Sequence, residues 1–185
     1  MKTFTKGFTI ALLLGLGFSA YAQKHVHGEG ELLIAQEGNV LQMQFIIPAA
    51  DALGFEHQAA NSSDKNAINV LAQQLKNSSH AIDIKGQCIL QSTENSLAHS
   101  HIEHDEHDEH DEHDEHDEHD EHDEHDHHNV KATYNFNCKT PVVGFSVTLF
   151  NLMPSLNALN VQWISNTGQG STEVTRSNPV ISWQS

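Results

Sequence analysis

The feature that most constrains this chain is a tract that holds no apolar side chain. From His104 to His128, seven His-Asp-Glu triplets run without a break and are followed by His-Asp-His-His. Ordering such a segment would cost conformational entropy without burying any apolar surface. We therefore expect residues 91–129 to form a disordered loop, and the core to come from two ordered parts of one domain, residues 23–90 and 130–185.

The start of the chain has the pattern of a secretory signal peptide. Two lysines precede an apolar run from Phe8 to Phe18, and Ala20-Tyr21-Ala22 supplies the small residues of a cleavage site. The run is too short to span a bilayer comfortably. We expect residues 1–22 to be removed, and the mature chain to be exported to a bacterial periplasm without membrane insertion. An uncleaved anchor is the alternative.

The charge of the chain lies in the tract. Sixteen of the 25 acidic residues fall between Glu103 and Asp126, and the other nine balance the nine lysines and arginines. The net charge of -16 therefore belongs to the tract. Because no basic residues cluster, neither nucleic acid nor an anionic membrane surface is an expected partner.

Alternating apolar residues predict strands in the first ordered part. Between Val40 and Ile47 every second side chain is apolar and would be buried, and a hairpin with Leu32–Ala35 follows from the intervening turn. Apolar residues at helical spacing predict a helix of about 13 residues that starts at Ser63-Asp64. Ile82–Leu90 is predicted to be one strand.

The second part repeats the strand pattern. The predicted strands are 131–139, 142–150, 161–164, 171–176 and 180–183, with a short helix at 151–159. Consecutive strands predict an α+β fold, with a mostly antiparallel sheet and one or two helices. A faint likeness between the two parts is compatible with two similar halves and also with chance.

The two cysteines, Cys88 and Cys138, lie on either side of the tract. In an oxidising compartment we expect a disulfide, which would hold together the two ends of the insertion. Closing a loop of this length stabilises the folded state by roughly 4 kcal/mol in the chain-entropy view. A pair of thiolate zinc ligands is the alternative.

The histidines of the tract point to metal binding. Imidazole nitrogen suits zinc, copper and nickel, and neighbouring carboxylates can complete the coordination or orient the rings. The candidate ligands are His99, His101, His104, His107, His110, His113, His116, His119, His122, His125, His127 and His128. They are enough for roughly three zinc ions. A solvated spacer, a pH-responsive loop and a calcium site made of carboxylates are the alternatives.

A second candidate site lies in the ordered part. His25 and His27 would project to one face of an extended segment, and His57 follows the predicted hairpin. These three histidines could bind one zinc ion. The alternative is a frayed N-terminus with a surface histidine, and His80 is expected to be solvated.

Several short stretches resemble the zinc-regulated periplasmic protein family (ZrgA type). They are HVHGEGEL at 25–32, EGN at 37–39, PAADxxGFEH at 48–57, VTLF at 147–150 and VQWI…TGQG at 161–170. In that family a variable His/Asp/Glu tract separates two ordered parts. The resemblance implies a periplasmic zinc-binding protein that assists uptake through an inner-membrane system, and it favours the site of His25, His27 and His57.

Two functions follow from these patterns. A zinc-capture protein would hold one ion at the ordered site and gather more, at lower affinity, in the tract. A metal sink would use the tract to buffer excess zinc, copper or nickel. We do not expect an enzyme, because no nucleophile and base stand in a recognisable arrangement and the candidate zinc ligands lack an evident general base.

Deletion of residues 99–128 should lower the zinc stoichiometry by at least about two ions. One tight site and a folded domain should remain, because the tract binds ions but adds nothing to the core. Calorimetric titration and circular dichroism measure the two outcomes. An unchanged stoichiometry, or a deletion variant that does not fold, would contradict the interpretation.

Overall fold

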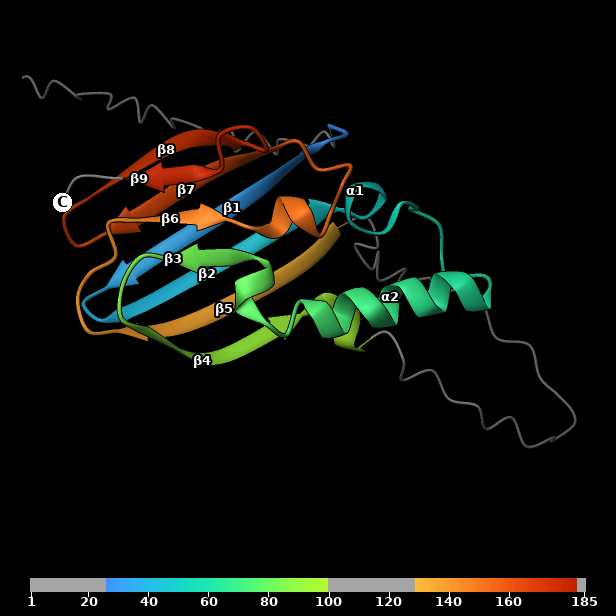
Figure 1. The fold of residues 1–185 in the computed structure, drawn as a ribbon, viewed down its shortest axis with the longest axis horizontal. Helices are drawn as coiled ribbons and strands as arrows, with labels where there is room; N and C mark the ends of the chain where they lie inside the picture. Colours follow the sequence, from blue (N-terminus) through green and yellow to red (C-terminus); the bar gives the residue numbers. More distant parts are fainter. Residues whose placement is uncertain (1–25, 100–128, 183–185) are drawn as a thin grey trace, which may run out of the picture.

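Residues 26–99 and 129–182 are described in a computed structural model of the chain (Figure 1). Their strands form a six-stranded sheet in the order β4-β5-β2-β1-β7-β8 and a three-stranded sheet in the order β3-β6-β9. The elements are β1 (Glu29–Glu37), β2 (Val40–Pro48), α1 (Ala49–Leu53), α2 (Ser62–Gln74), η1 (Ser78–His80), β3 (Ile82–Ile84), β4 (Cys88–Asn95), η2 (Ser96–His99), β5 (Asn129–Cys138), β6 (Gly144–Val147), η3 (Leu149–Asn151), β7 (Ala158–Ser165), β8 (Gly168–Thr175) and β9 (Val180–Ser182).

The α+β class predicted from the sequence is confirmed. Two α-helices accompany the sheets, and the three elements marked η are short 3₁₀ helices. Among the strand pairs of the described residues, only β1 and β7 run parallel. None of the helices in these residues is long and apolar enough to cross a membrane.

The alternation that predicted the strands also decides which face is buried. In β2, Leu41, Met43, Phe45 and Ile47 are all buried, as expected, while Gln42 on the other face is exposed. In β5 one face is likewise buried, with Ala132, Tyr134, Phe136 and Cys138 at 5% exposure or less. Because side chains of a strand alternate between faces, the large sheet has one apolar and one polar face.

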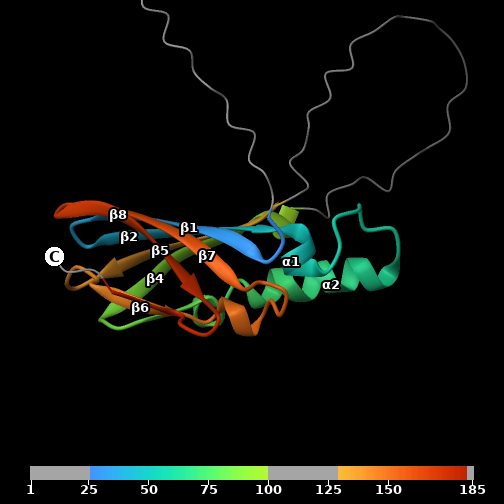
Figure 2. The ribbon, with the colours of Figure 1, turned by 90° about the horizontal axis from the view of Figure 1, so that it is seen from above.

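The apolar face of the large sheet is covered by the small sheet and by α2 (Figure 2). One cluster of buried residues contains Phe145 and Ile181 from the small sheet, Leu71 and Leu75 at the end of α2, and the inward face of β2. This is a two-layer arrangement around a single core.

The large sheet mixes strands from before and after the tract. β5 lies between β4 and β2, and β7 lies beside β1. Neither side of the chain therefore has a complete sheet of its own, and both contribute residues to the same core.

The large sheet has two distinct ends. At the first, the tract end, β4 ends at Asn95, β5 begins at Asn129, β2 ends at Pro48 and β1 begins at Glu29. At the opposite end, the disulfide end, β4 begins and β5 ends. In Figure 1 the tract end lies beside α1 and α2.

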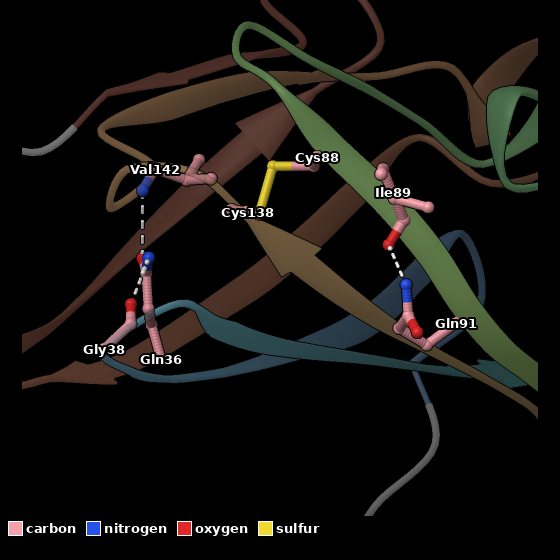
Figure 3. Close-up of a disulfide and its surroundings, with 7 residues drawn as sticks. All are labelled: Gln36, Gly38, Cys88, Ile89, Gln91, Cys138 and Val142. Atoms are coloured by element: carbon pink, nitrogen blue, oxygen red, sulfur yellow. Dashed lines mark hydrogen bonds between the residues drawn. A yellow bond between two sulfur atoms is a disulfide. The ribbon is translucent and has the colours of Figure 1, made fainter.

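The predicted disulfide between Cys88 and Cys138 is present (Figure 3). It was expected to hold the two ends of the insertion together, but it lies where β4 begins and β5 ends. The tract leaves the sheet at the other end of these strands. The eight residues of β4 separate it from the tract end by about 23 Å. The buried Gln36 lies at the same end, where its Oε1 accepts from the Val142 N–H at 3.2 Å.

Strand pairing, and not the disulfide, holds the two sides of the chain together at the tract end. Asn95 pairs with Ala132. The backbone N–H of Lys131 donates to Ser96 Oγ at 3.1 Å. The chain therefore leaves and re-enters the sheet at one place, fixed by non-covalent bonds.

Two segments differ from their predictions. Ile82–Leu90 is not one strand, because the chain turns at Lys85-Gly86 and the apolar residues on each side enter different sheets. The predicted disordered loop began at residue 91, but β4 continues to Asn95. The 3₁₀ helix η2 follows it and ends at His99. The ordered structure thus extends further than the loss of apolar residues suggested.

The predicted helix at 151–159 is absent. A 3₁₀ helix, η3, precedes it and β7 begins at Ala158. Arg176 donates through its guanidinium to the carbonyl oxygens of Phe150, Met153, Pro154 and Leu156, at 2.5 to 2.9 Å. In a helix these carbonyls would accept backbone hydrogen bonds. Here they are bound instead by the side chain of Arg176, the residue that follows β8. The strand predicted at 142–150 is also shorter, covering Gly144–Val147.

A buried tyrosine joins α2 to the large sheet. Tyr134 is fully buried, and its hydroxyl donates to the Leu75 carbonyl at 2.8 Å. Burial raises the pKa of this hydroxyl well above its ordinary value. The bond satisfies a carbonyl at the end of α2 that has no partner within the helix.

Replacement of Tyr134 by Phe should lower the free energy of unfolding by about 1–2 kcal/mol, because the Leu75 carbonyl would lose the shorter of its two hydrogen bonds. Urea unfolding measures this. Thr93→Val is the control, since the Thr93 hydroxyl lies 3.5 Å from the same carbonyl and should matter less. Because the pKa of Tyr134 is higher in the folded state than in the unfolded state, its contribution to stability depends on pH. The contribution is present below about pH 10 and is lost as the pH rises further. A Phe variant as stable as the native chain at neutral pH would contradict this.

Candidate metal centre

His27 lies in the turn that leads into β1, and its side chain is exposed. The backbone N–H of Glu29 donates to the Val26 carbonyl at 3.1 Å, which closes the turn. Gly28 occupies a left-handed conformation, with φ at 82°. A glycine is required for this geometry because a side chain there would be strained.

The peptide units of Gly28 are held on both sides. Its N–H donates to Asp51 Oδ2 on α1 at 2.8 Å. Its carbonyl accepts from the N–H groups of Asn157 at 2.7 Å and Ala158 at 3.0 Å. The backbone that follows His27 is therefore fixed between α1 and the start of β7.

The loop that carries Asn157 is itself held in place. The side chain of Arg176 binds four carbonyls, as described above. Its backbone N–H also donates to the Asn157 carbonyl at 2.9 Å. The guanidinium also lies over the Phe150 ring, 5.7 Å from its centroid. One arginine thus supports the surface against which the Gly28 carbonyl docks.

His57 lies in the segment after α1, which ends at Gly54 with φ at 86°. Its side chain is 61% exposed, and its Nε2 lies 3.2 Å from Asp64 Oδ2. The ring also contacts Phe55, with centroids 4.9 Å apart. These two contacts orient an imidazole that is otherwise open to solvent.

Asp64 has a second role at the start of α2. Its backbone N–H donates to Asn61 Oδ1 at 2.9 Å, and its carboxylate accepts from Asn61 Nδ2 at 2.9 Å. The first bond makes Asn61 the N-cap of α2 and satisfies one backbone donor at the helix N-terminus. The helix predicted over about 13 residues is confirmed and runs over 13, starting one residue early.

Candidate histidines from distant parts of the sequence belong to one end of the sheet. His27 precedes the start of β1, and His57 follows the end of β2 through α1. Pro48 pairs with Asn129, so β5 begins at the same end, and η2 ends there at His99. The topology therefore places His27, His57 and the two residues that flank the tract, His99 and Asn129, at the tract end.

The predicted three-histidine site is described only in part. His25 lies outside the described residues, as do the tract histidines from His101 to His128. Among residues 26–99 and 129–182 no group of three or more His, Cys, Asp or Glu side chains is close enough to hold a metal ion. The two cysteines form a disulfide, so the alternative of thiolate zinc ligands is wrong. His80 is exposed on η1, where its Nδ1 lies 3.0 Å from the Gln74 carbonyl.

Sequence reasoning missed the residues that support the two histidines. Asp51 and Asn157 bind the backbone of Gly28, and Arg176 holds the loop that carries Asn157. Bonds to backbone groups leave no residue pattern in the sequence. Asp64 could have been found, because Asn61-Ser-Ser-Asp64 before an apolar periodic segment has the spacing of a capping box.

The chain matches a family model described as ZrgA family zinc uptake protein, over residues 24–183. This range takes in all the described residues. No curated protein matches the chain.

The Gly28→Ala variant should be less stable than Gly54→Ala. Both residues have a similar positive φ, so each substitution should cost about 1–2 kcal/mol in backbone strain. A Cβ at Gly28 would also meet Asn157 Nδ2 at 2.8 Å, and moving this amide would break its bond to the Ser155 carbonyl at 3.1 Å, whereas a Cβ at Gly54 would meet nothing within 4 Å. Urea unfolding of the two variants measures the difference, and equal losses would show that the contact with Asn157 does not matter.

Proposed function

The chain belongs to the ZrgA family of zinc uptake proteins, and on that premise we propose that it is a periplasmic protein that captures zinc for uptake. Zinc is its cargo, held at one ordered site and gathered by the histidine tract. The proposal rests on the family match together with the position of His27 and His57 at the tract end of the sheet.

The ordered site consists of His25, His27 and His57. Two observations support it: the backbone after His27 is fixed on both sides, and the His57 ring is oriented by Asp64 and Phe55. An imidazole that donates one ring N–H to a carboxylate offers its other nitrogen to a metal. In the His57 ring, Nε2 would therefore donate to Asp64 while Nδ1 binds zinc.

The tract supplies further ions at lower affinity. Its twelve histidines, from His99 to His128, are attached on both sides at the tract end, next to the ordered site. Ligands tethered near a site raise the local concentration of ions available to it. Imidazole must be neutral to bind metal, so capture by the tract weakens below about pH 6.

Two features support the periplasm as the compartment, the signal-like start and the disulfide. Residues 1–22 direct export, and the mature domain consists of residues 23–90 and 130–185 around the tract. The disulfide of Cys88 and Cys138 is typical of an oxidising compartment such as the periplasm. The protein then hands zinc to an inner-membrane uptake system and catalyses no reaction of its own.

A metal sink is the alternative function, and the number of histidines in the tract favours it. The two functions differ in what growth requires. Loss of a capture protein impairs growth when zinc is scarce, whereas loss of a sink impairs growth when zinc, copper or nickel is in excess.

Replacement of His25, His27 and His57 by Ala should remove the tightest zinc site of the mature chain. The expected loss of affinity exceeds about a hundredfold, because changes to residues that merely orient ligands cost up to that much. Titration of the first zinc equivalent against a competing chelator measures the site while the tract stays weakly filled.

His80→Ala is the matched control, since His80 is an exposed histidine on a different element and its loss should leave this affinity unchanged. If the triple variant binds the first zinc ion as tightly as the native chain, the ordered site is not made of these residues.

A further inference from the structure

The polar face of the large sheet carries an open groove. The small sheet and α2 pack on the opposite face (Figure 2). The groove lies over β2, β1, β7 and β8 and has a volume of about 660 Å³. None of the described residues that line it is charged. On a chain with a net charge of -16, this is an uncharged surface that a ligand can enter.

The centre of the groove is apolar and its two sides are polar. Strand register places Leu33 of β1 directly between Gln44 of β2 and Gln162 of β7. Because neighbouring strands lie about 4.8 Å apart, the backbones of the two glutamines are about 10 Å from each other. In the next row Ala35 pairs with Ile164, which is 56% exposed. The groove is therefore an apolar strip with amide groups on both sides.

The amides on the β2 side are held in one orientation. Gln42 Nε2 donates to Asn135 Oδ1 at 3.0 Å, and Gln44 Nε2 donates to Thr133 Oγ1 at 3.1 Å. Asn135 is held in turn, because its Nδ2 donates to Ser92 Oγ at 2.9 Å. Each glutamine keeps its carbonyl oxygen as an acceptor for a ligand. Groups that are already oriented bind a ligand at a lower entropic cost.

The amides on the opposite side are available as donors. Gln162 of β7 and Gln169 of β8 are exposed. Neither makes a side-chain hydrogen bond within residues 26–99 and 129–182. Each offers two N–H donors and one acceptor. Oriented acceptors on β2 thus lie across the apolar strip from donors on β7 and β8.

These features favour one class of ligand. The described lining holds no cation for a phosphate or carboxylate, and no His, Cys, Asp or Glu side chain for a metal. An added peptide strand needs unpaired backbone groups, but β2, β1 and β7 each pair with a strand on both sides. A sugar ring matches both parts of the groove, because its C–H face is apolar and its hydroxyl groups both donate and accept.

We propose that this groove binds a neutral oligosaccharide. The sugar hydroxyls are bound by the amides of Gln42, Gln44, Gln162 and Gln169, and one face of a sugar ring packs on Leu33. The lining residues lie along the strands and not at the tract end, so the site is separate from the candidate zinc ligands. It goes beyond zinc capture, because it gives the protein a second ligand that could tether it to a carbohydrate polymer.

The test uses the mature chain, labelled with a nitrogen isotope for NMR. The neutral glycan probes are maltohexaose, cellohexaose and chitohexaose, and a glycine-serine peptide represents the other class of occupant. One variant combines Gln162→Ala with Gln169→Ala, which removes two exposed amides without breaking a described hydrogen bond. Gln91→Ala is the matched control, since Gln91 is an exposed glutamine of β4 that does not line the groove.

At least one of the three glycans should shift the amide signals of β1, β2 and β7, with a Kd of about 1 mM or tighter. The double variant should weaken this binding about tenfold, because each lost hydrogen bond lowers the affinity several-fold. Gln91→Ala should stay within about twofold of the native affinity. Unchanged melting temperatures would confirm that both variants keep the fold.

Three results would overturn the proposal. The first is no shift with any of the three glycans at about ten times the expected Kd. The second is glycan binding that the double variant does not weaken, or whose shifts lie outside the groove. The third is a peptide that shifts the groove or the β8 edge while the glycans do not, which would make this face a protein-docking surface. None of these results depends on zinc, so a failure here leaves the proposed zinc capture standing.

Discussion

The pairing of β5 with β2 is the interaction on which the rest of the structure depends. β2 lies before the tract and β5 after it, and the two strands pair along their whole length, from Val40 with Asn137 to Pro48 with Asn129. Their inward side chains form the middle of the core. Because the tract cannot contribute apolar surface, the chain reaches a stable core only when strands from both sides of it combine.

This pairing also decides where the candidate zinc ligands lie. An antiparallel pair places the end of one strand beside the start of the other, so the tract returns to the sheet where β2 leaves for α1. The disulfide joins β5 to its other neighbour, β4, at the opposite end of the sheet. The covalent restraint is therefore remote from the proposed zinc site. There Asp51 accepts from the Gly28 N–H, the Asn157 N–H donates to the Gly28 carbonyl, and Asp64 contacts the His57 imidazole.

Sequence reasoning succeeded where the physical cause is local. The alternation in β2 and β5 and the helical spacing of α2 are properties of neighbouring residues. It failed at 151–159, because a helix-like segment loses its carbonyls to Arg176, some twenty residues away. It failed again between Ile84 and Cys88, where a short turn sends two apolar runs into different sheets.

The sequence by itself determined the chemistry of this protein: the family, the histidines available for zinc, and the division of the chain by a segment with nothing to bury. The family follows from short stretches that resemble it and from the match to its model. The histidines and the division of the chain follow from composition and spacing, which are properties of the sequence alone. Only the tertiary structure decided that His27 and His57 share an end of the sheet with the base of the tract, and that a buried carboxylate at Asp51 fixes the backbone beside His27. Such contacts join residues distant in sequence through backbone groups, which every residue type carries, so no side-chain pattern reveals them.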